Sequence, residues 1–265
     1  MNCVLKYPGA KWGIAPWIIQ HFPPHHSYLE PFFGSGGVLF NKTRSNIETV
    51  NDLDGDVVNL FECIRSGPEK LAHIVYMTPY SRQIYNASYE MEPPEDKFDR
   101  AAQFLIRCNM GHGFRTAGGR VGWKNDVAGR ERAYAAKAWV ELPDLILDAA
   151  DRLRGVQIEC VDALELIPRF NNPSVLIYCD PPYVLSTRRG KQYRKEMTDN
   201  DHLHLLSLLK AHQGPVLISG YDSPMYNSEL EGWYKERTTT TDQLSQIKTE
   251  TLWMNFPPEQ QITLF

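Results

Sequence analysis

The sequence predicts an α/β fold with a mainly parallel sheet, an antiparallel strand near the C-terminus and an inserted, mostly helical domain. Short apolar runs rich in branched side chains alternate with segments of helical periodicity, which is typical of parallel sheets. Residues 61–154 show helical patterns without a convincing strand, and two strand-like runs lie near the C-terminus. We therefore expect a sheet domain made of residues 1–60 and 155–265, interrupted by a helical domain of residues 61–154.

The strands of the sheet are predicted from short apolar runs bounded by turn residues. In order, they are Tyr28–Phe33, Ile47–Val50, Val156–Cys160, Ser174–Cys179 and Pro215–Ser219. Such runs suit a sheet that is covered on both faces. The last two strands, Tyr234–Thr240 and Thr249–Asn255, are expected to pair antiparallel across a hydrophilic turn.

Four helices are predicted in and beside the insert, because apolar residues recur there every three to four positions. They span Asp56–Ser66, Phe98–Cys108, Arg130–Val140 and Leu142–Leu153. The glycine-rich residues from Gly111 to Arg130 are expected to form an extended loop or hairpin. Loops of this kind often carry recognition residues.

The composition is that of an ordinary globular chain of 265 residues with a net charge of −4. No run approaches the roughly 20 apolar residues of a membrane helix, and the N-terminus lacks the order of a signal peptide. We expect a cytoplasmic protein without membrane contact. The five cysteines are widely spaced and include no C-x-x-C pair, so free thiols and no metal site are expected.

Basic residues gather in two regions although the whole chain is acidic. Residues 107–137 hold seven Lys or Arg and two acids, and residues 188–195 hold five Lys or Arg and no acid. Each region alone is compatible with a solvated surface. Because the two regions flank the same motif, residues 180–183, they are also candidates for contacts with a polyanion.

A glycine-rich junction follows the first predicted strand. Its residues are Glu30-Pro31-Phe32-Phe33-Gly34-Ser35-Gly36-Gly37, after which Val38–Lys42 is expected to open a helix. Glycines at such a junction let the backbone approach a ligand closely, although glycine turns are also common without one. Asp52 follows the next strand, where an acid in nucleotide-type sites holds ribose hydroxyls. Together the two features predict a nucleotide-type cofactor site.

The most informative motif is Asp180-Pro181-Pro182-Tyr183, which ends the apolar run Val175–Cys179. Proline cannot continue a central strand, so Asp180 is expected at the carboxyl edge of the sheet, where ligands of α/β folds bind. An aromatic amino group is a poor nucleophile, and Asp180 and the Pro181 carbonyl can accept its two hydrogen bonds. Tyr183 can stack on the aromatic ring that carries this amino group. The alternative is a proline-rich turn with a capping aspartate.

Two other features are interpreted as structural. His21, His25 and His26 resemble metal ligands, but Pro23 and Pro24 indicate a surface turn. Cys179 resembles a nucleophile beside Asp180, yet it ends an apolar strand, so buried packing is expected.

These motifs, in this order, resemble the D12 class of DNA adenine-N6 methyltransferases, the Dam-like enzymes of bacteria and their phages. The resemblance runs from Lys6-Tyr7-Pro8-Gly9-Ala10-Lys11-Trp12 to Glu250-Thr251-Leu252-Trp253-Met254-Asn255. It implies a Rossmann-like methyltransferase sheet with an inserted target-recognition domain. It also implies S-adenosylmethionine as cofactor, S-adenosylhomocysteine as product, and double-stranded DNA as partner in the nucleoid of a bacterial or phage-infected cell. Roles in restriction–modification, phage evasion and regulation stay open.

The resemblance assigns roles to individual residues. The cofactor would be held by Tyr7, Lys11, Phe32, Gly34, Gly36, Asp52, Asp162 and Asp180. The catalytic residues would be Asp180, Pro181, Pro182 and Tyr183. The residues after Asn109 depart from the hairpin by which Dam enzymes read GATC, so the target sequence stays open.

Methylation of a paired base implies that adenine is flipped out of the duplex, at a cost of roughly a few kcal/mol. Basic side chains are expected to supply that energy through phosphate contacts, and Arg115 and Arg120 are expected to read guanine. The predicted DNA contacts are Arg115, Arg120, Lys124, Arg130, Arg132, Arg188, Arg189 and Lys191.

Two alternatives to this function remain at this point. Related motifs occur in methyltransferases of cytosine-N4, ribosomal RNA and protein glutamine, which more often carry Ser or Asn where Asp180 stands. A non-catalytic DNA-binding module could also keep the fold. Separately, the terminal residues 261–265 resemble the peptide by which bacterial replication proteins dock on the sliding clamp, with Leu264 and Phe265 as apolar anchors. The alternative is a last strand or tail that packs against the protein's own sheet.

Overall fold

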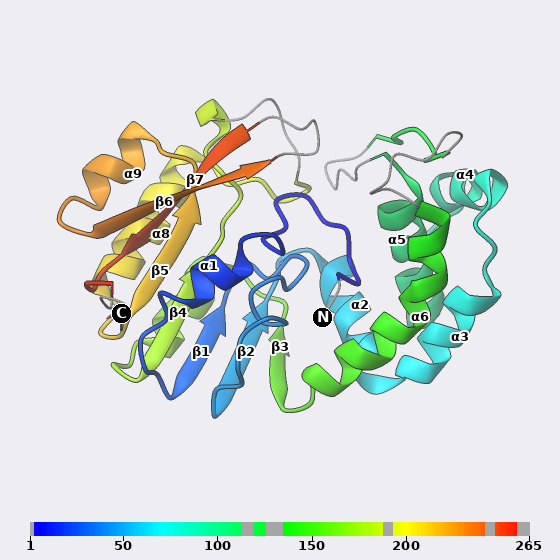
Figure 1. The fold of residues 1–265 in the computed structure, drawn as a ribbon, viewed down its shortest axis with the longest axis horizontal. Coiled ribbons are helices and arrows are strands. Elements are labelled where there is room, and N and C mark those ends of the chain that lie inside the picture. Colours follow the sequence, from blue (N-terminus) through cyan, green and yellow to red (C-terminus); the bar gives the residue numbers. More distant parts are fainter. Residues whose placement is uncertain (1–2, 113–118, 126–134, 188–192, 242–246, 259–265) are drawn as a thin grey trace, which may run out of the picture.

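The sheet has the predicted mainly parallel arrangement (Figure 1). The computed structural model describes residues 3–112, 119–125, 135–187, 193–241 and 247–258. Within these residues seven strands form one sheet in the order β3-β2-β1-β4-β5-β7-β6. Their bounds are β1 Ser27–Glu30, β2 Ile47–Asn51, β3 Val156–Glu159, β4 Val175–Cys179, β5 Val216–Gly220, β6 Tyr234–Thr241 and β7 Ile247–Met254.

Strand direction changes only at β7. β1 to β5 pair in parallel, whereas β7 runs antiparallel to both β5 and β6. The fold is therefore the expected Rossmann-like one, with antiparallel pairing at its C-terminal edge. β4 and β5 are buried at every residue, because helices cover both faces of the central strands.

Alternate residues of β4 enter different cores, since successive side chains of a strand point to opposite faces. Ile177 and Cys179 join a cluster with helices α7 Ala163–Leu166, α8 Asp199–Ala211 and α9 Pro224–Glu229. Leu176 and Tyr178 join the larger core on the other face, beside helix α1 Ala15–Ile19. Cys179 is 0% exposed, which confirms its predicted packing role.

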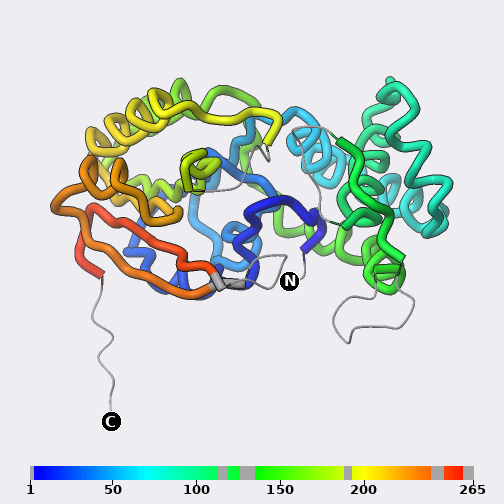
Figure 2. Tube along the Cα trace, turned by 90° about the horizontal axis from the view of Figure 1, so that it is seen from above, coloured from blue at the N-terminus to red at the C-terminus, as the bar shows by residue number. Residues whose placement is uncertain are grey.

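The insert forms a helical block at one end of the molecule, beyond β3 (Figures 1 and 2). Its helices are α2 Gly55–Ser66, α3 Pro68–Met77, α4 Arg82–Glu90, α5 Lys97–Met110 and α6 Ala135–Arg152. Gly111 and Trp123 form an antiparallel bridge, which agrees with the predicted hairpin for the part of that loop that the structure describes.

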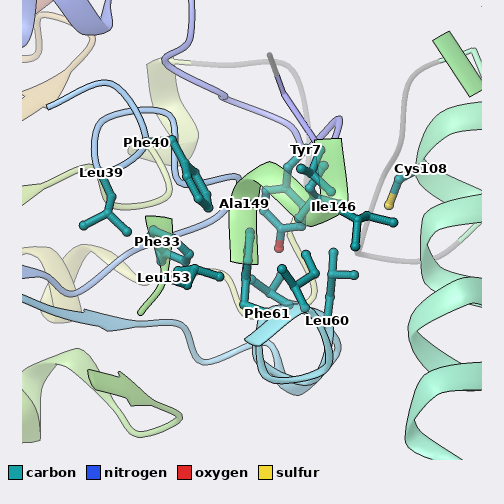
Figure 3. Close-up of a cluster of buried hydrophobic side chains, with 14 of the residues drawn as sticks. Tyr7, Phe33, Leu39, Phe40, Leu60, Phe61, Cys108, Ile146, Ala149 and Leu153 are labelled. Carbon is teal, nitrogen blue, oxygen red and sulfur yellow. The ribbon is translucent and has the colours of Figure 1, made fainter. Parts of the chain in front are cut away.

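One hydrophobic core joins the insert to the sheet (Figure 3). Phe33 comes from the glycine-rich loop and meets Phe61 of α2 edge to face, with ring centroids 4.7 Å apart. Ile146 and Ala149 of α6 pack in the same cluster. The glycine-rich loop is thereby anchored on the insert helices. The division into two domains at residues 60 and 155 stays a prediction.

Several predicted boundaries were wrong. Val38–Lys42 forms turns rather than a helix, although Phe40 and Lys42 make helix-type backbone hydrogen bonds to Gly36 and Val38. The two helices predicted around residue 141 are one helix, α6, which continues through Pro143. Burial of apolar residues on both sides of this proline, Trp139 and Ile146, outweighs the hydrogen bond that it removes. Helices α1, α3, α4, α7, α8 and α9 were not predicted.

Candidate active site

A cavity opens at the carboxyl ends of β1, β2 and β4, where the order of the strands reverses from one side of β1 to the other. Ligands of open α/β sheets bind at such switch points. The cavity is lined by segments that are far apart in the sequence. Its lining includes Tyr7, Lys11, Glu30, Phe32, Gly34, Asp52, Asp162, Asp180, Pro182 and Tyr193.

The glycine-rich loop turns sharply at two positions. Gly34 and Gly36 have φ angles of 50° and 70°, which favour glycine. A Cβ atom on Gly36 would lie 2.6 Å from carbon atoms of both Phe33 and Phe40. Gly34 lines the cavity, whereas Gly36 is absent from its lining and allows the loop to pack on the aromatic core. The two predicted glycines therefore act at different places in one turn.

Asp52 is held rigidly at the end of β2. Its Oδ2 accepts a hydrogen bond from Gly34 N at 2.8 Å, and its Oδ1 accepts one from Asp54 N at 2.8 Å. Burial raises the pKa of Asp52 to about 6, although the two backbone donors oppose the rise. The carboxylate thus faces the cavity in a fixed orientation, and each oxygen retains capacity to accept a further hydrogen bond.

Asn51 joins three neighbouring loops beneath Asp52. Its side-chain amide donates to the carbonyls of Pro31, at 2.9 Å, and of Val161, at 3.1 Å. Its Oδ1 accepts from Val161 N at 3.0 Å. Asp162 follows directly and caps helix α7 by accepting from Leu164 N at 2.8 Å. The loops after β1, β2 and β3 are therefore fixed relative to one another.

Asp180 lies at the end of β4, as the proline pair predicted. Its Oδ1 accepts from Ser219 Oγ at 3.0 Å, and its Oδ2 lies 2.8 Å from Lys11 Nζ. Burial raises the pKa of Asp180, and the nearby Lys11 ammonium partly opposes that rise. Burial would lower the pKa of Lys11, but Asp180 and then Glu250 raise it above its usual value. The geometry favours a carboxylate–ammonium pair at neutral pH.

The N-terminal segment closes one side of the cavity. Tyr193 donates a hydrogen bond from its hydroxyl to the Pro8 carbonyl at 3.2 Å, and its ring lies near that of Tyr7. Arg194 pairs with Asp54 and Asp56 at 3.4 and 3.0 Å. Arg194 is thus engaged within the protein, although the sequence placed it in a basic surface region.

The order of these motifs along the chain matches one known family. Residues 7–248 match the family model of the D12 class N6 adenine-specific DNA methyltransferase. The chain belongs to this family. It is 25% identical over 243 residues to the DNA adenine methylases of Salmonella typhi and Escherichia coli strain K12, covering 87% of this chain and 83% of each relative. A DNA adenine methylase of Vibrio cholerae is 25% identical over 190 residues, which are 69% of this chain and 66% of that protein.

This D12 class methyltransferase brings most of its predicted cofactor residues to one cavity. All of those residues except Gly36 line it, as does Pro182 of the catalytic motif. Tyr183 lies beside the cavity, where its ring meets Tyr221 edge to face with centroids 4.5 Å apart. That these residues bind the cofactor and the target base remains a prediction.

The predicted DNA contacts are described only in part. Arg120 donates a hydrogen bond to Asn86 Oδ1 and lies 3.6 Å from Glu90 Oε1, both residues of α4. Lys124 belongs to the hairpin, whose backbone accepts a hydrogen bond from Tyr80 at 2.8 Å. The other predicted contacts lie outside the described residues: Arg115, Arg130, Arg132, Arg188, Arg189 and Lys191.

Sequence reasoning missed three polar residues of the site. Glu30 is buried, accepts from Tyr28 at 2.8 Å and has a pKa raised by burial to about 8. Glu250 is 2% exposed and accepts a hydrogen bond from Tyr183. Tyr193 lines the cavity. An acid inside an apolar strand pattern, as in Glu250-Thr251-Leu252-Trp253-Met254, was a usable signal, because burial of an unpaired charge is costly.

Metal and membrane features are absent from the part of the chain that the structure describes. There, no group of three or more His, Cys, Asp or Glu side chains could hold a metal ion. No helix among those residues is both long and apolar enough to cross a bilayer. His25 hydrogen bonds to the Pro23 carbonyl and to Ser45 at 2.7 and 2.8 Å, so its ring nitrogens serve the local turn.

Proposed function

We propose that the protein transfers a methyl group from S-adenosylmethionine to the N6 amino group of adenine in double-stranded DNA. The observation that carries this proposal is the cavity itself. It unites the glycine loop, Asp52 and Asp162 with Asp180 of the Asp-Pro-Pro-Tyr motif. The products would be N6-methyladenine and S-adenosylhomocysteine.

The residues of the cavity fit the proposed cofactor. The glycine loop leaves room for a ligand, since a side chain on Gly34 would crowd Tyr7, whose ring is 3.3 Å from its Cβ position. Asp52 can accept hydrogen bonds from ribose hydroxyls, and Asp162 can lie beside the adenine ring. Lys11 and Tyr7 would contact the amino-acid part. When bound, S-adenosylmethionine supplies an electrophilic methyl group on its sulfonium.

Asp180 would activate the target amino group. Its carboxylate and the Pro181 carbonyl would accept the two N–H groups and favour the tetrahedral nitrogen over the planar, conjugated one. Ser219 fixes one oxygen of Asp180 at 3.0 Å, which limits the orientations that the carboxylate can adopt. Tyr183 would stack on the base. Holding the nitrogen in place for direct transfer contributes most of the expected rate acceleration.

Access to this site requires that the adenine leave the duplex. Unstacking and unpairing cost roughly a few kcal/mol, and phosphate contacts from basic side chains would offset that cost. The insert and the residues after the catalytic motif are the proposed contact regions. The hairpin of the insert, which includes Arg120 and Lys124, would contribute target recognition.

The test is to incubate the purified protein with duplex DNA and S-adenosylmethionine carrying an isotopically labelled methyl group. Digested DNA is then analysed by mass spectrometry, with RNA and single-stranded DNA as parallel substrates. We expect labelled N6-methyladenine and no N4-methylcytosine, with duplex DNA preferred. Label found in RNA alone, or on cytosine, would overturn the proposal.

A further inference from the structure

Glu250 lies on the antiparallel strand β7, which carries it to the edge of the sheet where Asp180 stands. Its neighbour Thr251 pairs with Gly220, the last residue of β5, and Cys179 pairs with Ile218 of the same strand. Glu250 therefore lies just beyond the end of β5, at the edge where β4 delivers Asp180. This carboxylate is almost completely buried, at 2% exposure.

Glu250 and Asp180 share one cation. Lys11 Nζ lies 2.8 Å from Asp180 Oδ2 and 3.8 Å from Glu250 Oε1, and it donates to the Gly9 carbonyl at 2.7 Å. All three charged side chains are largely buried. Two carboxylates and one ammonium leave a net negative charge, because a single lysine cannot neutralise both acids.

Tyr183 contacts two of these charged side chains, Glu250 and Lys11. Its hydroxyl donates to Glu250, and the Lys11 ammonium lies 4.9 Å from its ring centroid. A neutral phenol can therefore hold the Glu250 carboxylate by donating its hydroxyl proton. Glu250 thus contacts both Lys11 and Tyr183.

We propose that Glu250 is a positioning residue, which binds Lys11 and Tyr183 so that the Asp180 carboxylate stays a strong hydrogen-bond acceptor toward the substrate amino group. This inference rests on the proposed function. Without Glu250, Lys11 would pair with Asp180 alone, and a fully neutralised carboxylate is a weaker acceptor. With Glu250 present, Asp180, Glu250 and Lys11 together carry one net negative charge, and the Tyr183 ring is fixed beside them.

The pH dependence of Asp180 reflects all the groups around it. These are Lys11 of the N-terminal segment, Glu30 of β1, Tyr178 and Cys179 of β4, Tyr183, Ser219 of β5, Tyr226 of α9 and Glu250 of β7. Of these, Lys11, Ser219 and Tyr183 favour ionisation of Asp180, while the charges of Glu250 and Glu30 oppose it. Activity requires the ionised form, so the rate should rise with pH through an acid limb.

The experiment is the pH profile of the single-turnover methylation rate at saturating cofactor. Glu250→Gln keeps an acceptor for Tyr183 but removes a negative charge, so the acid limb should move down by about one pH unit. The plateau rate should fall, because a less basic carboxylate is a weaker acceptor for the substrate amino group. Lys11→Met should move the limb in the opposite direction. Glu236→Gln, on the neighbouring strand and exposed, is the matched control and should leave the profile unchanged.

An unmoved or raised acid limb in folded Glu250→Gln would overturn the inference. So would an unchanged rate with weakened cofactor affinity, which would place Glu250 in cofactor binding. If Glu250→Gln does not fold, Glu250→Asp replaces it, because its shorter side chain withdraws the charge from Lys11. The limb should then move down by a smaller amount, and an unmoved limb overturns the inference. Absence of N6-methyladenine with the unaltered protein would instead refute the proposed function.

Discussion

The buried carboxylates of the cavity are held in different ways, and this difference suggests different roles. Asp52 is fixed by two backbone N–H groups, from Gly34 and Asp54. Asp180 is held by side chains, those of Ser219 and Lys11. A carboxylate fixed by backbone suits constant binding of a cofactor. One held by a lysine and a hydroxyl can exchange part of its hydrogen bonding with a substrate.

Substitution should therefore separate binding from chemistry. Asp52→Ala should weaken binding of S-adenosylmethionine about tenfold or more, because hydrogen bonds to a charged group contribute roughly 1.5–3 kcal/mol. Asp180→Ala should leave that affinity within a few fold and abolish methyl transfer. Calorimetry measures the first effect and a labelled-methyl assay the second. The assignment is wrong if Asp180→Ala loses affinity but keeps full turnover.

A substitution at Gly36 would test how the glycine-rich loop packs. Gly36→Ala places a methyl group 2.6 Å from Phe33 and Phe40 at a φ of 70°, so the loop or the rings must shift. We expect a loss of about 1–3 kcal/mol in unfolding free energy and weaker cofactor binding. Gly13→Ala is the control, because its Cβ would meet nothing within 4 Å. Equal thermal stability of the two variants would contradict this explanation.

At the scale of elements, a buried ion cluster fastens the insert to the sheet. Glu48 of β2 accepts from Lys42 at 2.6 Å and from both terminal nitrogens of Arg152 on α6, at 2.6 and 2.9 Å. Burial would raise the pKa of Glu48, but the donors from Arg152 and Lys42 lower it to about 2. The carboxylate is thus ionised over the physiological range.

The cluster predicts how stability depends on pH. A lowered folded-state pKa means that Glu48 contributes its full stability above its usual pKa of 4.5 and loses it as pH falls to about 2. Glu48→Gln leaves two buried cations without their anion, so it should cost about 3 kcal/mol at pH 7. Denaturant unfolding at several pH values should show this difference shrinking between pH 4.5 and 2. The exposed Glu62→Gln is the control, and a difference that persists at pH 2 would contradict the account.

At the scale of the whole molecule, the insert and the sheet share a core, but the cavity and the hairpin lie on different parts of it. The core cluster runs from Tyr28 and Tyr178 of the sheet to Trp139 and Ile146 of α6. The cavity lies on the sheet side of this core, while the hairpin containing Trp123 lies on the insert side. DNA bound across both parts would place recognition and chemistry on one continuous body.

The C-terminal tail is predicted to serve the molecule as a tether. Residues 261–265 lie outside the described residues, and the prediction rests on their resemblance to a clamp-binding peptide. Leu264→Ala combined with Phe265→Ala should abolish binding to a purified bacterial sliding clamp. Turnover on short duplexes should be unchanged, because tethering raises local concentration without altering the site.

Surface plasmon resonance and the labelled-methyl assay measure these two properties, with Glu259→Ala as the control. Clamp binding that survives the double substitution would refute the tether. Loss of folding would show instead that the two anchors belong to the protein's own core.

The sequence by itself determined the parallel sheet, the helical insert and the residues of the glycine and Asp-Pro-Pro-Tyr motifs. These follow from local chemistry. Short apolar runs rich in branched residues mark the strands, Pro181 and Pro182 end a strand, and Gly34 permits a positive φ. Two local predictions were wrong, because tertiary packing overrode local preference. Val38–Lys42 forms turns where a helix was expected, and α6 continues where a break was expected.

Only the tertiary structure decided which charges meet. Nothing near Lys11 in the sequence indicates that it contacts Asp180, or that Glu250 lies within 4 Å of the same ammonium. Those contacts arise because β4 and β5 pair in parallel while β7 returns antiparallel beside β5, which brings distant residues to one edge. Burial at that edge then strengthens each electrostatic interaction, since little water remains to screen it.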